Sequence, residues 1–147
     1  MEIFKIYNSN NKPNSSEKEQ IVNFLFEHLE QYGDKKIDIS KCLDYAVKDQ
    51  ISAQGGFVLV LKNKEGIQGI TIVNETGMSG YIPENILVYI AVSKESRGKG
   101  YGKILMQKAM ELAQGDMALH VEPENPAKFL YEKLGFENKY LEMRFKK

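Results

Sequence analysis

An apolar run, a glycine-rich turn and a helical pattern, in that order, constrain the fold of this chain most strongly. Residues 86–92 are all apolar or aromatic, as in a strand that is covered on both faces of a sheet. The turn Arg97-Gly98-Lys99-Gly100-Tyr101-Gly102 follows, then a helical pattern over 103–114 and a strand pattern over 117–121. This spacing predicts a βαβ crossover whose two strands lie parallel in one sheet.

The remaining pattern adds further strands and helices to this unit. A capping box at Ser16 to Glu19 predicts the start of a first helix that ends at Gly33, and a second helix is expected from 38–40 onward. A last helix is expected from Asn125-Pro126 to Gly135, and strands are expected at 2–7, 57–61, 67–73 and 140–145. The order predicts one α/β domain over 1–147, with a mixed, mostly antiparallel sheet flanked by helices.

Composition narrows the classes of partner. The formal net charge is zero, so bulk electrostatics favour neither nucleic acid nor an anionic membrane. No run approaches the roughly 20 apolar residues of a membrane span, and no leader pattern precedes Ile3, so a cytoplasmic location is expected. Cys42 is the only cysteine and is expected to be a small buried hydrophobe. We expect no metal site.

The glycine run indicates a phosphate-binding turn. Its three glycines expose backbone N–H groups beside Arg97, Lys99 and Lys103 at the start of a helix. A dinucleotide fingerprint requires G-x-G-x-x-G, whereas the glycines here are spaced G-x-G-x-G. A Walker A loop requires Ser or Thr after its Lys, but Ile104 follows Lys103. Both of these motifs fit poorly.

A third motif fits. Arg97-x-x-Gly100-x-Gly102 after a hydrophobic strand resembles the coenzyme A motif Q/R-x-x-G-x-G/A of the GCN5-related N-acetyltransferase superfamily. Residues 125–136 resemble the second signature of that superfamily, an Asn, then an Ala, then Leu-Tyr-x-Lys-x-Gly-Phe. The resemblance covers about 57–145, and the first 55 residues match only in the order of their elements.

The resemblance implies that the chain binds acetyl-CoA and releases CoA. The cofactor pyrophosphate would lie on the turn, made of Arg97, Gly98, Lys99, Gly100, Tyr101, Gly102 and Lys103. The pantetheine arm and the acetyl oxygen would lie along Ile90, Ala91 and Val92, where family members carry a bulge and the strand splays from its neighbour. Asn125 would bond to the arm, but its spacing to Tyr131 is one residue shorter than usual. Whether Asn125 binds the cofactor or only caps its helix stays open.

The resemblance also implies a general acid. The matching tyrosine is Tyr131, whose phenol would protonate the leaving thiolate, although its helical face is also that of a core aromatic. No base is identified. Glu75, Glu84 and His120 are candidates, and Glu75, Tyr81 and Glu84 could attract a cationic amine. His28 is expected to be a packed histidine.

Taken with the resemblance, the sequence predicts an N-acetyltransferase that moves acetyl directly to a primary amine of a small molecule or peptide. The alternatives are a non-catalytic CoA-binding sensor or assembly module, and a domain for another phosphate ligand such as a nucleotide. Because dimers are common in the family, the resemblance also allows a homodimer.

Overall fold

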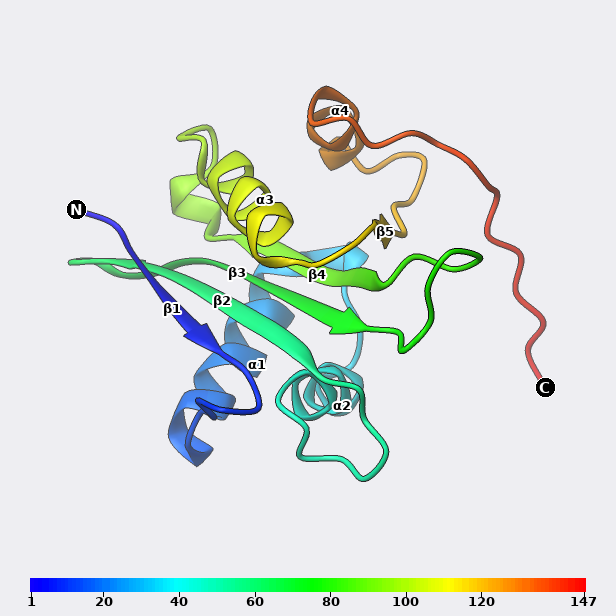
Figure 1. Cartoon of the computed structure of the whole chain (residues 1–147). Coiled ribbons are helices and arrows are strands. Elements are labelled where there is room, and N and C mark those ends of the chain that lie inside the picture. Colours follow the sequence, from blue (N-terminus) through cyan, green and yellow to red (C-terminus); the bar gives the residue numbers. More distant parts are fainter.

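A computed structural model describes residues 1–147 and contains a five-stranded sheet in the order β1-β2-β3-β4-β5 (Figure 1). Neighbouring strands from β1 to β4 are antiparallel, and β5 is parallel to β4. The strands are β1 (Ile3–Tyr7), β2 (Gly56–Asn63), β3 (Gly66–Glu75), β4 (Asn85–Val92) and β5 (Met117–Leu119). The helices are α1 (Ser15–Leu29), α2 (Lys36–Ala46), α3 (Tyr101–Leu112) and α4 (Ala127–Lys133), with short 3-10 turns η1 (Glu30–Tyr32) and η2 (Lys94–Ser96).

The helices cover the two faces of the sheet in pairs. Helices α1 and α2 lie on one face and α3 and α4 on the other (Figure 1). Each side has its own core, because strand side chains alternate between the faces. Leu25, Leu43 and Ile72 belong to the core under α1 and α2, whereas Leu59 and Leu105 belong to the core under α3. The predicted fold class is therefore confirmed.

The central crossover is also confirmed. Strands β4 and β5 are parallel and joined through α3, and β2 and β3 form the expected hairpin around Lys64 and Glu65. Strand β5 is shorter than predicted, since it ends at Leu119. No helix combines the length and the apolar character needed to cross a membrane.

The start of α1 differs from the prediction by two residues. Asn14, not Ser16, caps the helix, because its side chain accepts a hydrogen bond from the Glu17 N–H at 2.8 Å. The Glu17 carboxylate in turn accepts from the Asn14 N–H at 2.9 Å. Asn is as good a cap as Ser, and the box places Glu three residues later in both cases. The sequence therefore predicted a capping box correctly but placed it two residues too late.

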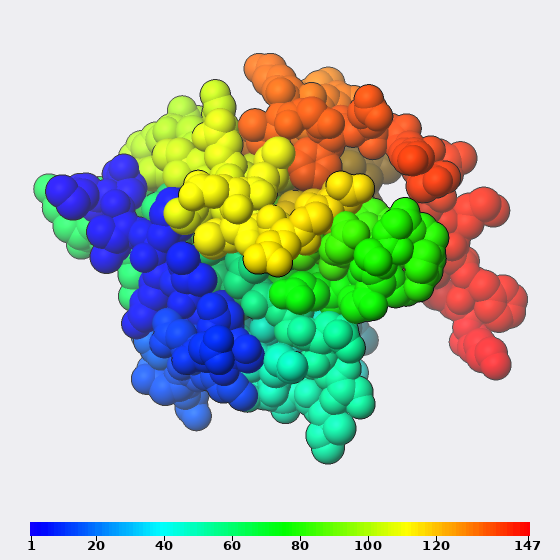
Figure 2. Space-filling model, viewed as in Figure 1, coloured from blue at the N-terminus to red at the C-terminus, as the bar shows by residue number.

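The predicted last strand at 140–145 is wrong for the isolated chain. Residues 137–147 form no helix or strand and run clear of the sheet (Figures 1 and 2). A strand exists only through hydrogen bonds to a partner strand, and no strand of the chain pairs with this segment. Its alternating pattern has strand character, but the partner is absent.

Candidate active site

The turn between β4 and α3 has the conformation that its glycines predict. Gly98 and Gly100 both have φ +85°, in the left-handed region that glycine adopts without strain. Gly102 lies in the first turn of α3, where an added Cβ would make only ordinary contacts, 3.4 Å from Leu130 and 3.9 Å from Val92. Two of the three glycines therefore shape the turn through their backbone conformation.

The turn presents a row of unused donors. None of the backbone N–H groups from Gly98 to Lys103 donates a hydrogen bond within the chain, and Ile104 is the first to bond back, to Gly100. The row coincides with the positive end of α3. The side chains of Lys99 and Lys103 are exposed and form no ion pair. This arrangement suits a phosphate group.

A cavity of about 240 Å³ lies at this turn. It extends from the turn to the last residue of β4, Val92, and to Leu130 on α4. The free N–H row and the unpaired lysines therefore adjoin a space with an apolar side. A ligand with a phosphate at one end and a less polar arm at the other fits this combination. Its lining residues are Val92, Ser96, Arg97, Gly98, Gly100, Tyr101, Gly102, Lys103 and Leu130.

Arg97 lines the cavity, but its guanidinium is bound elsewhere. It donates to the backbone carbonyl of His28 at 2.9 Å and to the carboxylate of Glu30 at 3.0 Å. His28 is buried, as expected, and its Nδ1 accepts a hydrogen bond from the Lys94 N–H at 3.2 Å. The C-terminal end of α1 and the residue Glu30 that follows it thus hold the turn in place. A direct contact of the Arg97 side chain with phosphate stays a prediction.

Tyr101 reaches the site only through its backbone. Its side chain is 9% exposed and packs in the core beneath α3. Its hydroxyl makes only long contacts, 3.5 Å from Asn63 and 3.4 Å from Glu2. The free N–H group of Tyr101 is therefore the part that a ligand on the turn can meet.

Strand β4 carries a bulge, as the family resemblance implied. Tyr89 pairs with Ile72 and Leu87 with Val73, so Val88 is an extra residue between them. Residues two apart on a regular strand lie on the same face, but the bulge puts Leu87 and Tyr89 on opposite faces of the sheet. Leu87 packs under α3, while Tyr89 packs under α1 and α2.

Strand β4 also loses its second neighbour at the bulge. Its pairing with β5 ends at Leu87 and Leu119, whereas β4 continues to Val92. The Ser93 N–H donates to the backbone carbonyl of Gln68, on β3, at 2.9 Å. Because antiparallel bonding alternates, the backbone groups of Ile90 and Val92 then point away from β3, toward the side where β5 has ended. These groups are free for a ligand.

Ala91 does not belong to this set. Its backbone faces β3 by the same alternation, and its side chain is buried in the core under α1 and α2. The structure therefore brings Ile90 and Val92 to the open side of β4, but not Ala91, which was expected there as well.

Tyr131 lies in the core under α3 and α4, on the same face of the sheet as the cavity. It is 7% exposed, and its ring meets that of Phe136 edge to face at 6.2 Å. Its hydroxyl has no hydrogen-bond partner in the chain. Asn74 Oδ1 is the one fully buried side-chain polar atom that lacks a partner, so the Tyr131 hydroxyl is not fully buried. The Tyr131 hydroxyl therefore keeps access to solvent. Burial raises the pKa of Tyr131 to about 12, so the phenol stays protonated at neutral pH.

Asn125 caps α4. Its Oδ1 accepts a hydrogen bond from the Ala127 N–H at 3.0 Å, which gives this side chain a structural role. The cap uses only the carbonyl oxygen, and the side-chain NH₂ group makes no bond within the chain. A further contact of Asn125 with a cofactor arm stays a prediction.

The acidic candidates lie at the far end of β4 from the turn. Glu75 pairs with Asn85 at the start of that strand, and Tyr81 is exposed on the loop between β3 and β4. The Glu84 carboxylate accepts the Asp116 N–H at 2.7 Å, and this bond lowers its pKa. A carboxylate that is already bound and more acidic than usual is a weaker base. His120 is exposed directly after β5.

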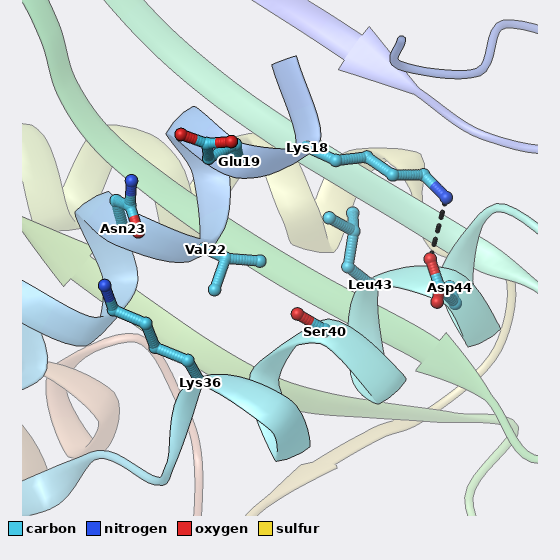
Figure 3. Close-up of a pocket in the computed structure, with 8 residues that line it drawn as sticks. All are labelled: Lys18, Glu19, Val22, Asn23, Lys36, Ser40, Leu43 and Asp44. Carbon is cyan, nitrogen blue, oxygen red and sulfur yellow. Dashed lines mark hydrogen bonds and ion pairs between the residues drawn. The ribbon is translucent and has the colours of Figure 1, made fainter. Parts of the chain in front are cut away.

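A second, larger hollow of about 400 Å³ lies between α1 and α2 (Figure 3). The ion pair between Lys18 and Asp44, 2.8 Å long, crosses one side of it. Charged and polar side chains form most of its wall, and none of the candidate catalytic or cofactor-binding residues lies in it. The lining residues are Lys18, Glu19, Val22, Asn23, Lys36, Ser40, Leu43 and Asp44.

Sequence reasoning missed the residues that support the turn. Ser96 is buried and its hydroxyl bonds to the side chain of Gln68, while Glu30 and the His28 carbonyl hold Arg97. These partners lie far apart in the sequence, so no spacing could reveal them. Leu130 could have been identified from the sequence, since it belongs to the second family signature.

A domain with this sheet order, with a glycine-rich turn of free N–H groups between β4 and α3, has the architecture of the acyl-CoA N-acyltransferases. Residues 54–138, more than half of the chain, match the model of the acetyltransferase (GNAT) domain. The chain therefore belongs to the GCN5-related N-acetyltransferase family. A search of curated proteins finds no match.

Solved structures share the fold at low sequence identity. An aminoglycoside N-acetyltransferase AAC(6')-Iy in complex with CoA is 16% identical, with a TM-score of 0.67 over 100% of this chain and 96% of that chain. The ribosomal-protein-S18-alanine N-acetyltransferase of Escherichia coli is 14% identical, with a TM-score of 0.67 over 95% and 80%. A transcriptional regulator from Bacillus halodurans is 21% identical, with a TM-score of 0.67 over 97% and 100%.

Proposed function

We propose that this chain transfers an acetyl group from acetyl-CoA to a primary amine, directly, while both substrates are bound. The observation that carries the proposal is the bulge in β4 and the end of its pairing with β5. Strand β4 pairs with β5 only as far as Leu87, so beyond the bulge at Val88 the backbone groups of Ile90 and Val92 are free and lie next to the glycine turn. A site that holds the cofactor and a site that polarises its carbonyl would thus be adjacent.

The residues of the turn fit the phosphate end of acetyl-CoA. The N–H groups from Gly98 to Lys103 would donate hydrogen bonds to the pyrophosphate, and Lys99 and Lys103 would add positive charge. Acetyl-CoA, when bound, supplies an acyl group activated as a thioester. Val92 and Leu130 offer an apolar wall for the arm of the cofactor.

The N–H groups of Ile90 and Val92 would stabilise negative charge as it develops on the acetyl oxygen. Tyr131 would act on the departing sulfur. Its pKa of about 12 lies well above the roughly 8.5 of a thiol, so complete proton transfer to a thiolate is uphill. We therefore assign Tyr131 the role of a hydrogen-bond donor that supports the sulfur while charge builds on it.

The acceptor is proposed to be an amine of a small molecule or peptide. The amine must arrive from a side that the cofactor leaves open, and the turn and Tyr131 both lie on the α3 and α4 side of the sheet. The opposite side presents Tyr89, whose hydroxyl donates to Asp34 at 2.5 Å. Asp34 is exposed, so a cationic amine could meet a carboxylate there.

Two measurements test the proposal. Thermal unfolding with acetyl-CoA, CoA, ATP or NAD separates the ligand classes, and at 100 times Kd the proposed ligand should raise Tm by roughly 5–10 °C. Release of free thiol is then followed with a panel of amines. Stabilisation by CoA without thiol release for any amine would favour a non-catalytic CoA-binding module. Stabilisation by ATP or NAD alone would reject the proposal.

A further inference from the structure

The imidazole of His28 joins α1 to the segment that leads into the glycine turn. The residue is 9% exposed, and its ring lies on that of Phe24, with the ring centroids 4.4 Å apart. Its Nδ1 accepts a hydrogen bond at 3.2 Å from the N–H of Lys94, the first residue of η2 and 66 positions away. Since η2 connects the end of β4 to the turn, a side chain of α1 helps to fix where the turn begins.

This hydrogen bond requires one protonation state of the ring. An imidazole nitrogen accepts a hydrogen bond only when it carries no proton. The single proton of the neutral ring therefore lies on Nε2, which faces the carboxylate of Glu27 at 3.5 Å. A second proton would make Nδ1 a donor that points at another donor, the Lys94 N–H. The bond between His28 and Lys94 cannot form in that state.

The other anchors of η2 leave the Lys94 N–H dependent on His28. The Ser96 N–H donates to the Ser93 carbonyl at 2.9 Å, and the Ser96 hydroxyl bonds to the side chain of Gln68. No second acceptor within the chain meets the Lys94 N–H. A partly buried donor that loses its acceptor is unfavourable, so η2 would have to shift to find a new partner. The glycine turn, which follows directly, would shift with it.

The charges around His28 favour such a shift once the ring is charged. The charged groups around the contact come from α1, η1, η2 and the turn, and β4 contributes none; they are Glu27, Glu30, Lys94, Glu95 and Arg97. The pKa of Glu95 is lowered first by the Ser93 hydroxyl and further by His28 and Lys94. The carboxylates of Glu27 and Glu95 would thus attract a charged ring, while the Lys94 N–H would repel it.

We propose that His28 is a positioning residue of the glycine turn, and that a proton on its Nδ1 loosens the turn and weakens its hold on the phosphates of acetyl-CoA. Because the bound cofactor favours the neutral ring, affinity is highest where His28 is neutral and falls as the pH falls. The inference rests on the proposed function for the identity of the ligand, but not for the contact itself.

Nuclear magnetic resonance tests the contact without a ligand. The chain has two histidines, so nitrogen-15 spectra of the imidazoles resolve His28 beside the exposed His120. At pH 8 the His28 Nδ1 should carry no proton and the Lys94 amide should be protected from exchange. Between pH 8 and 5, where histidines change charge, the Lys94 protection factor should fall as His28 gains its proton. A proton on Nδ1 at pH 8, a ring that stays neutral to pH 5, or unchanged protection would each overturn the inference.

Calorimetric titration with acetyl-CoA over the same pH range tests the consequence for binding. The Oδ1 of His28→Asn can replace Nδ1 as acceptor and gains no charge, so this variant should match the parent at pH 8. On going to pH 5.5, the Kd of the parent should rise about 3- to 10-fold more than that of His28→Asn, the range for one hydrogen bond. His28→Leu offers no acceptor and should bind more weakly at every pH.

The matched control is His120→Asn, which removes the other histidine and should keep the pH dependence of the parent. Circular dichroism establishes that each variant is folded. Equal pH dependence in the parent and His28→Asn would overturn the inference, as would a folded His28→Asn that binds as weakly as His28→Leu. Failure of the parent to bind acetyl-CoA at pH 8 would instead overturn the proposed function, and the resonance experiment would still decide whether His28 holds the turn.

Discussion

The guanidinium of Arg97 donates to the carboxylate of Glu30 at 3.0 Å, across 67 positions of sequence. The motif arginine thus ties the turn between β4 and α3 to the end of α1, and it is not a free cation above the cavity. The N–H row and the two unpaired lysines remain as the groups that can meet phosphate. Arg97 would then act on cofactor affinity by holding the turn in place.

Substitution of Glu30 tests whether Arg97 acts by holding the turn in place or by binding phosphate directly. If Arg97 acts through the turn, Glu30→Gln should weaken acetyl-CoA binding about 1.5- to 5-fold, the range expected for one exposed ion pair. Calorimetric titration measures the change, and Glu19→Gln on the preceding helix α1, an exposed carboxylate that forms no ion pair, is the control. Tighter binding by Glu30→Gln would mean that the released Arg97 meets the phosphate directly.

Gly100→Ala should damage both stability and binding. Its φ of +85° would cost an alanine about 1–2 kcal/mol of folding stability, and a Cβ would stand in the ligand's path. The Kd for CoA should rise roughly 10- to 100-fold, as for the loss of one hydrogen bond to a charged group. Gly135→Ala, with φ +102° and open space around it, is the matched control and should lose stability only. Equal effects on CoA binding would remove the turn from the site.

Tyr131→Phe should leave the Kd for CoA unchanged and lower turnover by about 10²-fold or more, because only the hydroxyl is lost. Tyr101→Phe is a suitable control, since Tyr101 is buried in the same core and its hydroxyl makes only long contacts. Steady-state kinetics and titration on the same samples separate the two effects. Unchanged turnover would assign Tyr131 to the core alone.

The pH dependence of turnover should show no alkaline decline that is due to Tyr131. Burial raises its pKa to about 12, so the hydroxyl keeps its proton while the acceptor amine loses its own. Turnover should therefore rise with pH and reach a plateau that extends through pH 10. A decline between pH 9 and 10 that disappears in Tyr131→Phe would contradict the assigned pKa.

The capping box predicts a separate pH effect on stability. Hydrogen bonds from the Asn14 N–H and Lys5 lower the pKa of Glu17 to about 2. The stabilisation by its carboxylate is thus fully present above the unfolded pKa of about 4.5 and is lost as the pH falls toward 2. Glu17→Gln should be less stable than the parent in urea at pH 7, and the two should converge near pH 2. Glu19→Gln, which removes a neighbouring carboxylate outside the box, should show no such convergence.

The sequence predicted those parts of the site that depend on neighbouring residues. The glycine turn between strand and helix and the cap at Asn125 are local, so spacing and residue type suffice to indicate them. The bulge at Val88 is different. Nothing in the apolar run 86–92 marks one of its residues as extra, because the bulge exists only in the pairing of β4 with β3. Only the family resemblance indicated it.

By itself, the sequence determined the order of the elements as far as α4, the parallel crossover and the glycine turn before α3, because periodicity and glycine spacing act over a few residues. Only the tertiary structure decided that Arg97 binds Glu30, that Ala91 turns away from the open side of β4, and that 140–145 lacks a partner strand. Each of these depends on which distant segment lies alongside. That choice is made by the packing of the whole domain, and local pattern does not contain it.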